Sequence, residues 1–216
     1  MGQYYNWTID ELLYAAQCGF DGVCTNEHHQ NAYGFMPSPN IMGSVLAKLT
    51  NGSNVAIVQM GATLPTSNPP IRVAEEYGML DCISGGRLVA GMPLGTPMDA
   101  NLCYGITPME HRERYREAFA LTLKAWQARE IFAWNGRYYQ LAEVNLWPRP
   151  IQQPHPHMTG DRYGHRSDQA AQDARATAPQ RLYESHDKEP PNDRDQAHPY
   201  HQIGSLGRGD LEHQHE

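Results

Sequence analysis

Residues 19–29, GFDGVCTNEHH, decide how the fold of this chain is interpreted, because a short apolar strand runs directly into an acid and two histidines. In parallel α/β architectures, ligands bind and reactions occur at the carboxyl ends of the strands. Glu27, His28 and His29 are therefore candidates for catalysis or ligand contact. Ordinary capping or surface roles are the alternative, which the spacing alone leaves open.

The alternation of helix and strand continues along the chain. Thr8-Ile9-Asp10-Glu11 has the form of a capping box, which predicts a helix over 9–18 that stops at Gly19. The apolar run NVAIVQMG at 54–61 is typical of a parallel strand that is covered on both faces. Asn135-Gly136, between two apolar runs, predicts a tight hairpin. The other expected elements are a strand over 22–26, a helix from Ser38-Pro39, a helix between Asn68-Pro69-Pro70 and Gly85-Gly86, a strand over 87–92 and a helix over 107–127. This spacing indicates an α/β fold with a parallel sheet or barrel.

The composition divides the chain into two parts. Residues 1–157 hold every Val, Phe, Trp and Cys, whereas residues 158–216 are dense in Asp, Arg, Gln, His and Pro. A segment of that second kind cannot bury enough apolar surface to offset its chain entropy. We therefore expect one folded domain over 1–157 and a disordered tail over 158–216.

Charge and residue usage argue against several classes of function. The net charge is −7 and the basic residues form no run, so no nucleic-acid partner is expected. No apolar stretch approaches the roughly 20 residues of a membrane span, and the start of the chain lacks the order of a signal peptide, so a cytoplasmic location is expected. The four cysteines form no CxxC pair, and the His-x-His spacings stand without a structured frame, so neither disulfides nor a metal site is expected.

Five motifs, in the expected order, resemble the bacterial-luciferase-like flavin-dependent monooxygenases. They are Glu27-His28-His29, the block NPPIRVAEE at 68–76, SGGRL at 84–88, RER at 112–114 and NLWPRPIQQPHP at 145–156. The resemblance implies a (β/α)₈ TIM barrel that uses reduced FMN, supplied by a separate reductase, and O₂ to oxygenate a small organic substrate. A sister branch uses F420 instead, and a homodimer or a heterodimer is compatible with the resemblance. Substrate, choice of cofactor and oligomeric state remain open.

The resemblance also implies roles for individual residues. It places His28 beside the flavin ring, where imidazole suits proton transfer near neutral pH. Glu27 orients His28 or caps a helix, and His29 is structural. Gly61, Ala62 and Thr63 follow a barrel strand where the backbone passes close under the ring, or else they form a plain turn. Structural roles are expected for Arg72, Glu75, Glu76 and Asp81 as ion pairs or caps, and for Trp126, Trp134, Tyr138, Tyr139 and Trp147 as core or interface aromatics on a hairpin that could cover the barrel mouth.

Three departures from the family pattern predict a partial barrel. The first strand is missing before the helix at Ile9, Leu94 stands where many members carry a flavin-contacting Arg, and no apolar strand is expected after Pro156, where a phosphate-holding loop should follow. The chain therefore has the form of a truncated or frame-shifted member, and we expect it to bind FMN poorly. A catalytically inactive fragment or a non-catalytic subunit is the competing interpretation.

Overall fold

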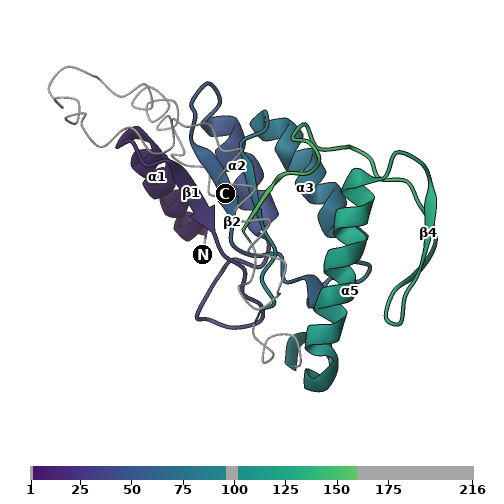
Figure 1. Cartoon of the computed structure of the whole chain (residues 1–216). Coiled ribbons are helices and arrows are strands. Elements are labelled where there is room, and N and C mark those ends of the chain that lie inside the picture. The colour runs from purple at the N-terminus through teal and green to yellow at the C-terminus, as the bar shows by residue number, and fades with distance from the viewer. Residues whose placement is uncertain (1, 96–101, 160–216) are drawn as a thin grey trace, which may run out of the picture. The chain divides into compact units, whose positions relative to one another are not determined.

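A computed structural model describes residues 2–95 and 102–159, so the expected disorder of 158–216 lies almost wholly outside the described residues. The elements are α1 (Gly2–Gln17), β1 (Gly22–Thr25), α2 (Pro39–Leu49), β2 (Ala56–Gln59), the 3₁₀ turn η1 (Leu64–Thr66), α3 (Ile71–Ser84), β3 (Leu88–Gly91), α5 (Pro108–Gln127), β4 (Phe132–Asn135), β5 (Gln140–Val144) and β6 (His157–Thr159). Figure 1 shows α2 and α3 side by side, with α5 beyond them. The predicted α/β order is confirmed.

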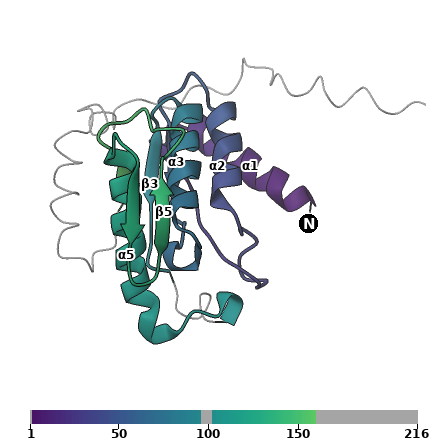
Figure 2. The ribbon, with the colours of Figure 1, turned by 90° about the vertical axis from the view of Figure 1, so that its right-hand side faces the viewer.

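The sheet is parallel and runs in the order β1-β2-β3-β6. Val23, Ile57 and Leu88 lie in one register row and are buried on the helical side. The neighbouring row, Cys24, Val58, Val89 and His157, is on the other face and is less buried. Figure 2 shows β3 behind the hairpin strand β5 and beside α3. This arrangement, with helices on one face of consecutive parallel strands, is part of a barrel wall.

The expectation that no strand follows Pro156 was wrong, because β6 pairs with β3 from His157 to Thr159. The chain is brought there by Gln152. Its backbone N–H and side-chain amide donate to the two carboxylate oxygens of buried Asp81, at 2.9 and 2.6 Å, and its Oε1 accepts the N–H of His157 at 3.1 Å. A three-residue strand of weak apolar character thus forms because its neighbours hold it in register.

Helix α1 begins earlier than predicted. Thr8 is no cap: its Oγ1 donates to the carbonyl of Tyr4 at 3.0 Å, inside the helix. Tyr5 packs against the core on the same face as Ile9 and Leu12, at helical spacing, so the first turns also gain burial. The turns before Ile9 are thus helical without a capping box at Thr8, and Tyr5 extends the packing face into them.

The hairpin forms, but its turn differs from the prediction. Asn135 pairs with Gln140, so the turn spans 136–139 instead of Asn135-Gly136. Glu117 of α5 causes this. Its carboxylate accepts the backbone N–H groups of Arg137, Tyr138 and Tyr139 at 3.0–3.1 Å and the indole N–H of Trp134 at 3.2 Å. The hairpin lies along α5 on the side away from the sheet (Figure 1). It therefore does not cover the mouth of the barrel, which was the role considered for it.

Contacts of the predicted structural kind are present for three of the four polar residues of α3. Arg72 and Glu76 form an ion pair at 3.3 Å, and Asp81 is buried against Gln152. Gly85 ends α3 with φ 68°, the left-handed conformation that favours glycine. Trp126 is buried and donates its indole N–H to the carbonyl of Ala74 at 3.0 Å, which holds α5 against α3. Within 2–95 and 102–159, no helix is long and apolar enough to cross a membrane.

Candidate functional site

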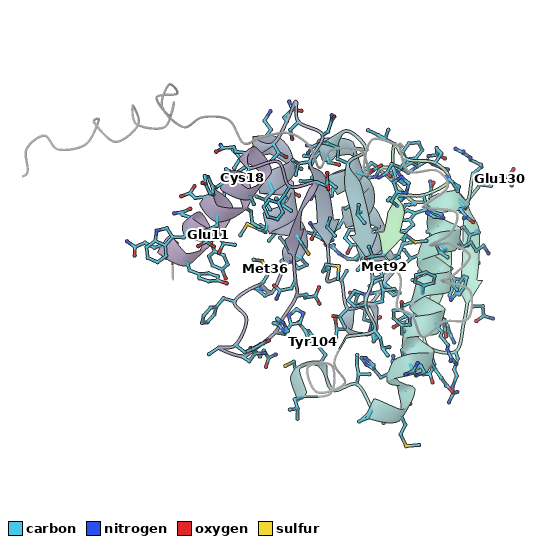
Figure 3. All side chains as sticks on the ribbon, turned by 60° about the vertical axis from the view of Figure 1, so that its left-hand side comes forward. Glu11, Cys18, Met36, Met92, Tyr104 and Glu130 are labelled. Atoms are coloured by element: carbon cyan, nitrogen blue, oxygen red, sulfur yellow. The ribbon has the colours of Figure 1, made fainter. Side chains whose placement is uncertain are left out.

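The segments that leave β1, β2 and β3 meet at the carboxyl edge of the sheet. Glu27, His28 and His29 follow β1, and Gly61, Ala62 and Thr63 follow β2. The structure brings these two segments into direct contact, because the N–H of Thr63 donates to Oε1 of Glu27 at 3.3 Å. Figure 3 shows Tyr104, from the segment before α5, at this end of the sheet as well.

Glu27 and His29 form a tight, largely buried pair. His29 Nε2 lies 2.7 Å from Glu27 Oε1, and the two side chains are 13% and 11% exposed. The same carboxylate oxygen accepts the N–H of Thr63, so it is an acceptor. The proton of a neutral His29 therefore sits on Nε2, and Nδ1 is left as an acceptor. The expectation that Glu27 orients His28 is corrected: Glu27 orients His29.

Tyr104, which was not among the predicted site residues, completes this cluster. Its hydroxyl lies 2.9 Å from His29 Nδ1, and the two rings meet edge to face. Partial burial, followed by the charges of Glu27 and Cys103, raises the pKa of Tyr104. The hydroxyl therefore keeps its proton at neutral pH and donates it to Nδ1. Tyr104 is 75 residues from His29 and belongs to no motif, so the sequence holds no signal for the contact.

His28 points to a different neighbourhood. Its backbone N–H donates to the carbonyl of Met36 at 3.0 Å, and its ring lies edge to face on Tyr33, with centroids 5.1 Å apart. Gly34 passes so close to this ring that a Cβ there would lie 2.6 Å from Cδ2 of His28. The loop over 30–36 thus packs against His28, whereas Glu27 and His29 face the other side of the edge.

Gly61 is required by the chain itself. A Cβ at this position would lie 2.7 Å from the backbone nitrogen of Glu27 and would overlap its Cβ. Ala62 and Thr63 beside it are buried. Behind the turn, the buried hydroxyl of Tyr77 reaches the carbonyls of Gly91 at 2.6 Å and Gly61 at 3.3 Å. Tyr77 therefore ties the ends of β2 and β3 together.

The segment after β3 is held by α5. His111 Nε2 lies 2.7 Å from the carbonyl of Leu94, and the hydroxyl of Tyr115 donates to the carbonyl of Met92 at 2.8 Å. His111 is buried, so it donates from Nε2 to this carbonyl in a dry environment. Leu94, the position where the family pattern has an Arg, is thus fixed through its backbone.

A cleft of about 250 Å³ opens beside Glu27, His29 and Tyr104, where α2 and α3 begin. Its charged groups have opposite signs and are partly paired. Arg72 binds one oxygen of Glu76, and Asn40 donates to the other at 2.8 Å. The lining consists of Glu27, His29, Pro37, Ser38, Pro39, Asn40, Ala62, Thr66, Ser67, Asn68, Pro69, Arg72, Val73, Glu76 and Tyr104. Such a lining suits a small molecule that carries polar groups on an apolar body.

The described sequence matches one protein family over most of its length. The model of the luciferase-like monooxygenases matches residues 2–161. Among solved structures, the monooxygenase RslO1 from Streptomyces bottropensis is similar with a TM-score of 0.68 and 29% identity, over 80% of this chain and 51% of that one. The predicted barrel-wall fold and the resemblance drawn from the motifs therefore have independent support.

Three curated relatives show the range of the similarity. An uncharacterized protein, y4wF, of Sinorhizobium fredii is 34% identical over 68% of this chain and 43% of its own. The oxygenase component of a flavin-dependent trigonelline monooxygenase of Acinetobacter baylyi is 27% identical over 71% of this chain and 42% of its own. An F420-dependent glucose-6-phosphate dehydrogenase of Kineococcus radiotolerans is 29% identical over 68% of this chain and 44% of its own. The chain thus spans less than half the length of these relatives.

Proposed function

This chain belongs to the luciferase-like monooxygenase family, and we propose that it serves a flavin-dependent monooxygenase reaction in which reduced FMN and O₂ oxygenate a small organic substrate. The observation that carries the proposal is the contact between the segment after β1 and the turn after β2, where Glu27 accepts the N–H of Thr63. It joins the loop that carries His28 to the small-residue turn at one edge, where family members hold the flavin ring.

When bound, the reduced flavin supplies the electrons for the reaction with O₂. The protein's residues then have three tasks. His28 would hold or deliver a proton, the small Ala62 would let the ring approach the turn, and Thr63 fixes that turn through Glu27, against which Gly61 allows it to pack. Leu64 is buried behind the turn and keeps water from that side.

The described residues fit a flavin ring better than a flavin phosphate. Ala62 lines the cleft and offers it a methyl group, which suits a flat uncharged ring, while Gly61 lets the turn lie directly against Glu27. Arg72 is the one arginine or lysine among the described residues of the cleft lining, and it is paired with Glu76. A dianionic phosphate needs several donors, and lacking two charge-assisted hydrogen bonds weakens binding by about 10²-fold. This supports the expectation that the 216-residue chain binds FMN poorly.

An F420-dependent oxidoreductase is the second candidate, because one of the relatives bears that name at similar identity. The same edge residues would serve both cofactors. The discriminating measurement is a pair of anaerobic titrations with reduced FMN and reduced F420, each followed by calorimetry. Tighter binding of F420, with no O₂ consumption, would favour the second candidate.

We also propose a dimer, held by an apolar stripe on α2 and α3. Ile41, Val45 and Leu49 recur every four residues on α2 and are exposed, and Met79 and Ile83 are exposed on α3. Such a stripe on two neighbouring helices is suited to burial against a second copy or a related subunit. Ile41→Glu should lower the sedimentation coefficient to that of a monomer, whereas Glu130→Lys, an exposed charge change after α5, should not. A monomeric wild-type chain would refute the dimer.

The proposed oxygenation requires a separate flavin reductase and is expected to occur in the cytoplasm. The direct test supplies the chain with a reductase, NADH, FMN and O₂, and measures O₂ consumption that depends on an added organic compound. Consumption that is abolished in His28→Ala but not in Tyr33→Phe would support the proposal. If saturating reduced FMN gives no substrate-dependent consumption, the chain is the non-catalytic fragment or subunit.

A further inference from the structure

The directions of the hydrogen bonds in the Glu27–His29–Tyr104 cluster follow from its chemistry. Glu27 Oε1 is an acceptor because the N–H of Thr63 also points to it. His29 Nε2 must then donate over 2.7 Å, and Nδ1 must accept over 2.9 Å from the hydroxyl of Tyr104. With its proton committed to His29, the oxygen of Tyr104 is left with lone pairs.

We propose that the cleft binds a small molecule carrying a weakly acidic hydroxyl group, of the phenol or enol class, and that Tyr104, His29 and Glu27 remove its proton. This goes beyond the function proposed above, which gives a proton role to His28 and none to this cluster. His28 does not line the cleft, whereas Glu27, His29 and Tyr104 all do.

The step balances as a proton transfer without any oxidant or reductant. The ligand's O–H bond breaks and its proton goes to the oxygen of Tyr104. The proton already on that oxygen passes to Nδ1 of His29, and the ligand is left as an oxyanion. The imidazolium that forms is held by Glu27, in the manner in which a carboxylate supports the histidine of a hydrolase triad. The net charge of the site with its ligand does not change.

The surroundings of the cluster fit this ligand class. Ala62, Val73 and Pro37 give the cleft apolar surface beside the polar groups, which suits an aromatic or unsaturated body. The raised pKa of Tyr104, caused first by burial and then by Glu27 and Cys103, keeps its hydroxyl protonated at neutral pH. Tyr104 can therefore pass a proton on, but cannot itself stand as the base. Imidazole is the acceptor whose proton affinity suits a weak acid near neutral pH.

The first test uses 4-nitrophenol, whose absorbance separates the phenol from the phenolate. It is titrated with the 216-residue chain, without any flavin, at a pH one unit below its midpoint in free solution. The bound probe should be mostly phenolate, which is about a tenfold or larger shift in its ionisation equilibrium. In Tyr104→Phe and in His29→Asn the bound probe should return to the free ratio.

Tyr33→Phe is the matched control, because it removes an exposed phenol at the same edge that does not line the cleft. It should leave the phenolate fraction at the wild-type value. Absence of saturable binding to the wild-type chain, or an unchanged phenolate fraction in Tyr104→Phe, would overturn the proposal.

The second test needs no ligand and no substitution that endangers folding. In ¹⁵N spectra of the histidine side chains, His29 should show a protonated Nε2 and an unprotonated Nδ1 at a pH where it is neutral. The opposite tautomer would overturn the relay, because Nδ1 could not then accept from Tyr104. Both tests are independent of flavin and O₂, so this inference and the proposed oxygenation can fail separately.

Discussion

Two carboxylates in this molecule accept hydrogen bonds of the same two kinds, from backbone N–H groups and from a ring N–H, and differ in what the ring can do. Glu27 accepts a backbone N–H and a ring N–H from His29, and Glu117 accepts three backbone N–H groups and a ring N–H from Trp134. The indole of Trp134 is a donor only, so the Glu117 cluster can hold a turn but cannot move a proton. The imidazole of His29 has a second nitrogen, and Tyr104 stands behind it. We call Glu117 with the four groups that donate to it the latch, because it only holds the hairpin turn. The Glu27 cluster differs because its ring is an imidazole, which can also accept a proton.

The largest expected effect lies in the loop that holds Glu27. In a preparation that oxygenates substrate, His28→Ala should lower turnover by about 10²- to 10⁴-fold, the usual contribution of a general acid or base. The free energy of unfolding should change far less, because the ring packs against a loop at the edge. Unchanged turnover would remove His28 from the mechanism and leave the Tyr104–His29–Glu27 cluster as the acid–base group of this edge.

At Glu117 we expect the opposite pattern, a loss of stability without a change at the cleft. Glu117→Ala leaves three backbone N–H groups and an indole N–H without their acceptor, and should lower the free energy of unfolding by about 3 kcal/mol. Denaturant unfolding measures this, and the 4-nitrophenol spectrum of the folded variant should stay at the wild-type value. A variant with wild-type stability would show that the strand pairing of β4 with β5, and not Glu117, holds the hairpin.

Two glycine substitutions compare how rigid the clusters are. In Gly61→Ala the new methyl group meets the backbone of Glu27, so the two segments must separate, at a cost of about 2 kcal/mol. In Gly136→Ala the methyl group meets the carboxylate of Glu117 and the indole nitrogen of Trp134, so it displaces the acceptor that holds the turn, and a cost of about 3 kcal/mol, like that of Glu117→Ala, is expected. Thermal unfolding of the pair measures both costs, and a loss in Gly136→Ala far below that of Glu117→Ala would show that the carboxylate can move aside without losing its hydrogen bonds.

The stability that Glu117 contributes should fall as the pH is lowered. Burial alone would raise the pKa of Glu117, but the hydrogen bonds from Tyr138, Tyr139, Trp134 and Arg137 together lower it below its ordinary value. A lowered folded-state pKa gives stability that is present above the unfolded value of about 4.3 and is lost as the pH falls through the folded value. The stability difference between wild type and Glu117→Gln should therefore be constant near neutral pH and shrink below about pH 4. A difference that grows in acid would contradict the lowered pKa.

The smallest effect is expected at Glu113, one helical turn before Glu117. Glu113 binds the guanidinium of Arg137 at 2.7 Å and the hydroxyl of Tyr138 at 2.6 Å, but the ion pair is exposed. Glu113→Ala should change the unfolding free energy by less than about 1 kcal/mol, since exposed ion pairs are screened by water. If Glu113→Ala lost as much stability as Glu117→Ala, the backbone N–H groups that Glu117 accepts would not explain why Glu117 matters more than Glu113.

Local signals predicted the elements whose ends are determined by their own residues. Gly85 in the left-handed conformation ends α3, and Pro108 opens α5, both where the sequence places them. Strand β6 was missed because its pairing depends on Gln152 binding Asp81, 71 residues away. The hairpin turn was misplaced because Glu117 of another element, and not Asn135-Gly136, determines it.

The site shows the same division. The motif Glu27-His28-His29 was found because it directly follows a recognisable strand, and Gly61 because it ends one. Of the two roles left open for Glu27, the orientation of His28 was wrong, since adjacent residues in a loop point in different directions and sequence order carries no information about which ring faces the acid. Tyr104 was missed because its contact exists only in three dimensions.

The hydroxyl of Tyr77 has a consequence for assembly. This side chain belongs to α3, yet it binds the carbonyls of Gly61 and Gly91, so the turn at the carboxyl edge and the position of α3 vary together. The outer face of the same helix carries Met79 and Ile83, which belong to the proposed dimer stripe. Association of subunits and occupation of the site would then act on one shared element, and by linkage each would change the free energy of the other to the same extent. Tyr77→Phe would uncouple them, leaving a protein whose dimerisation constant no longer depends on what the site holds.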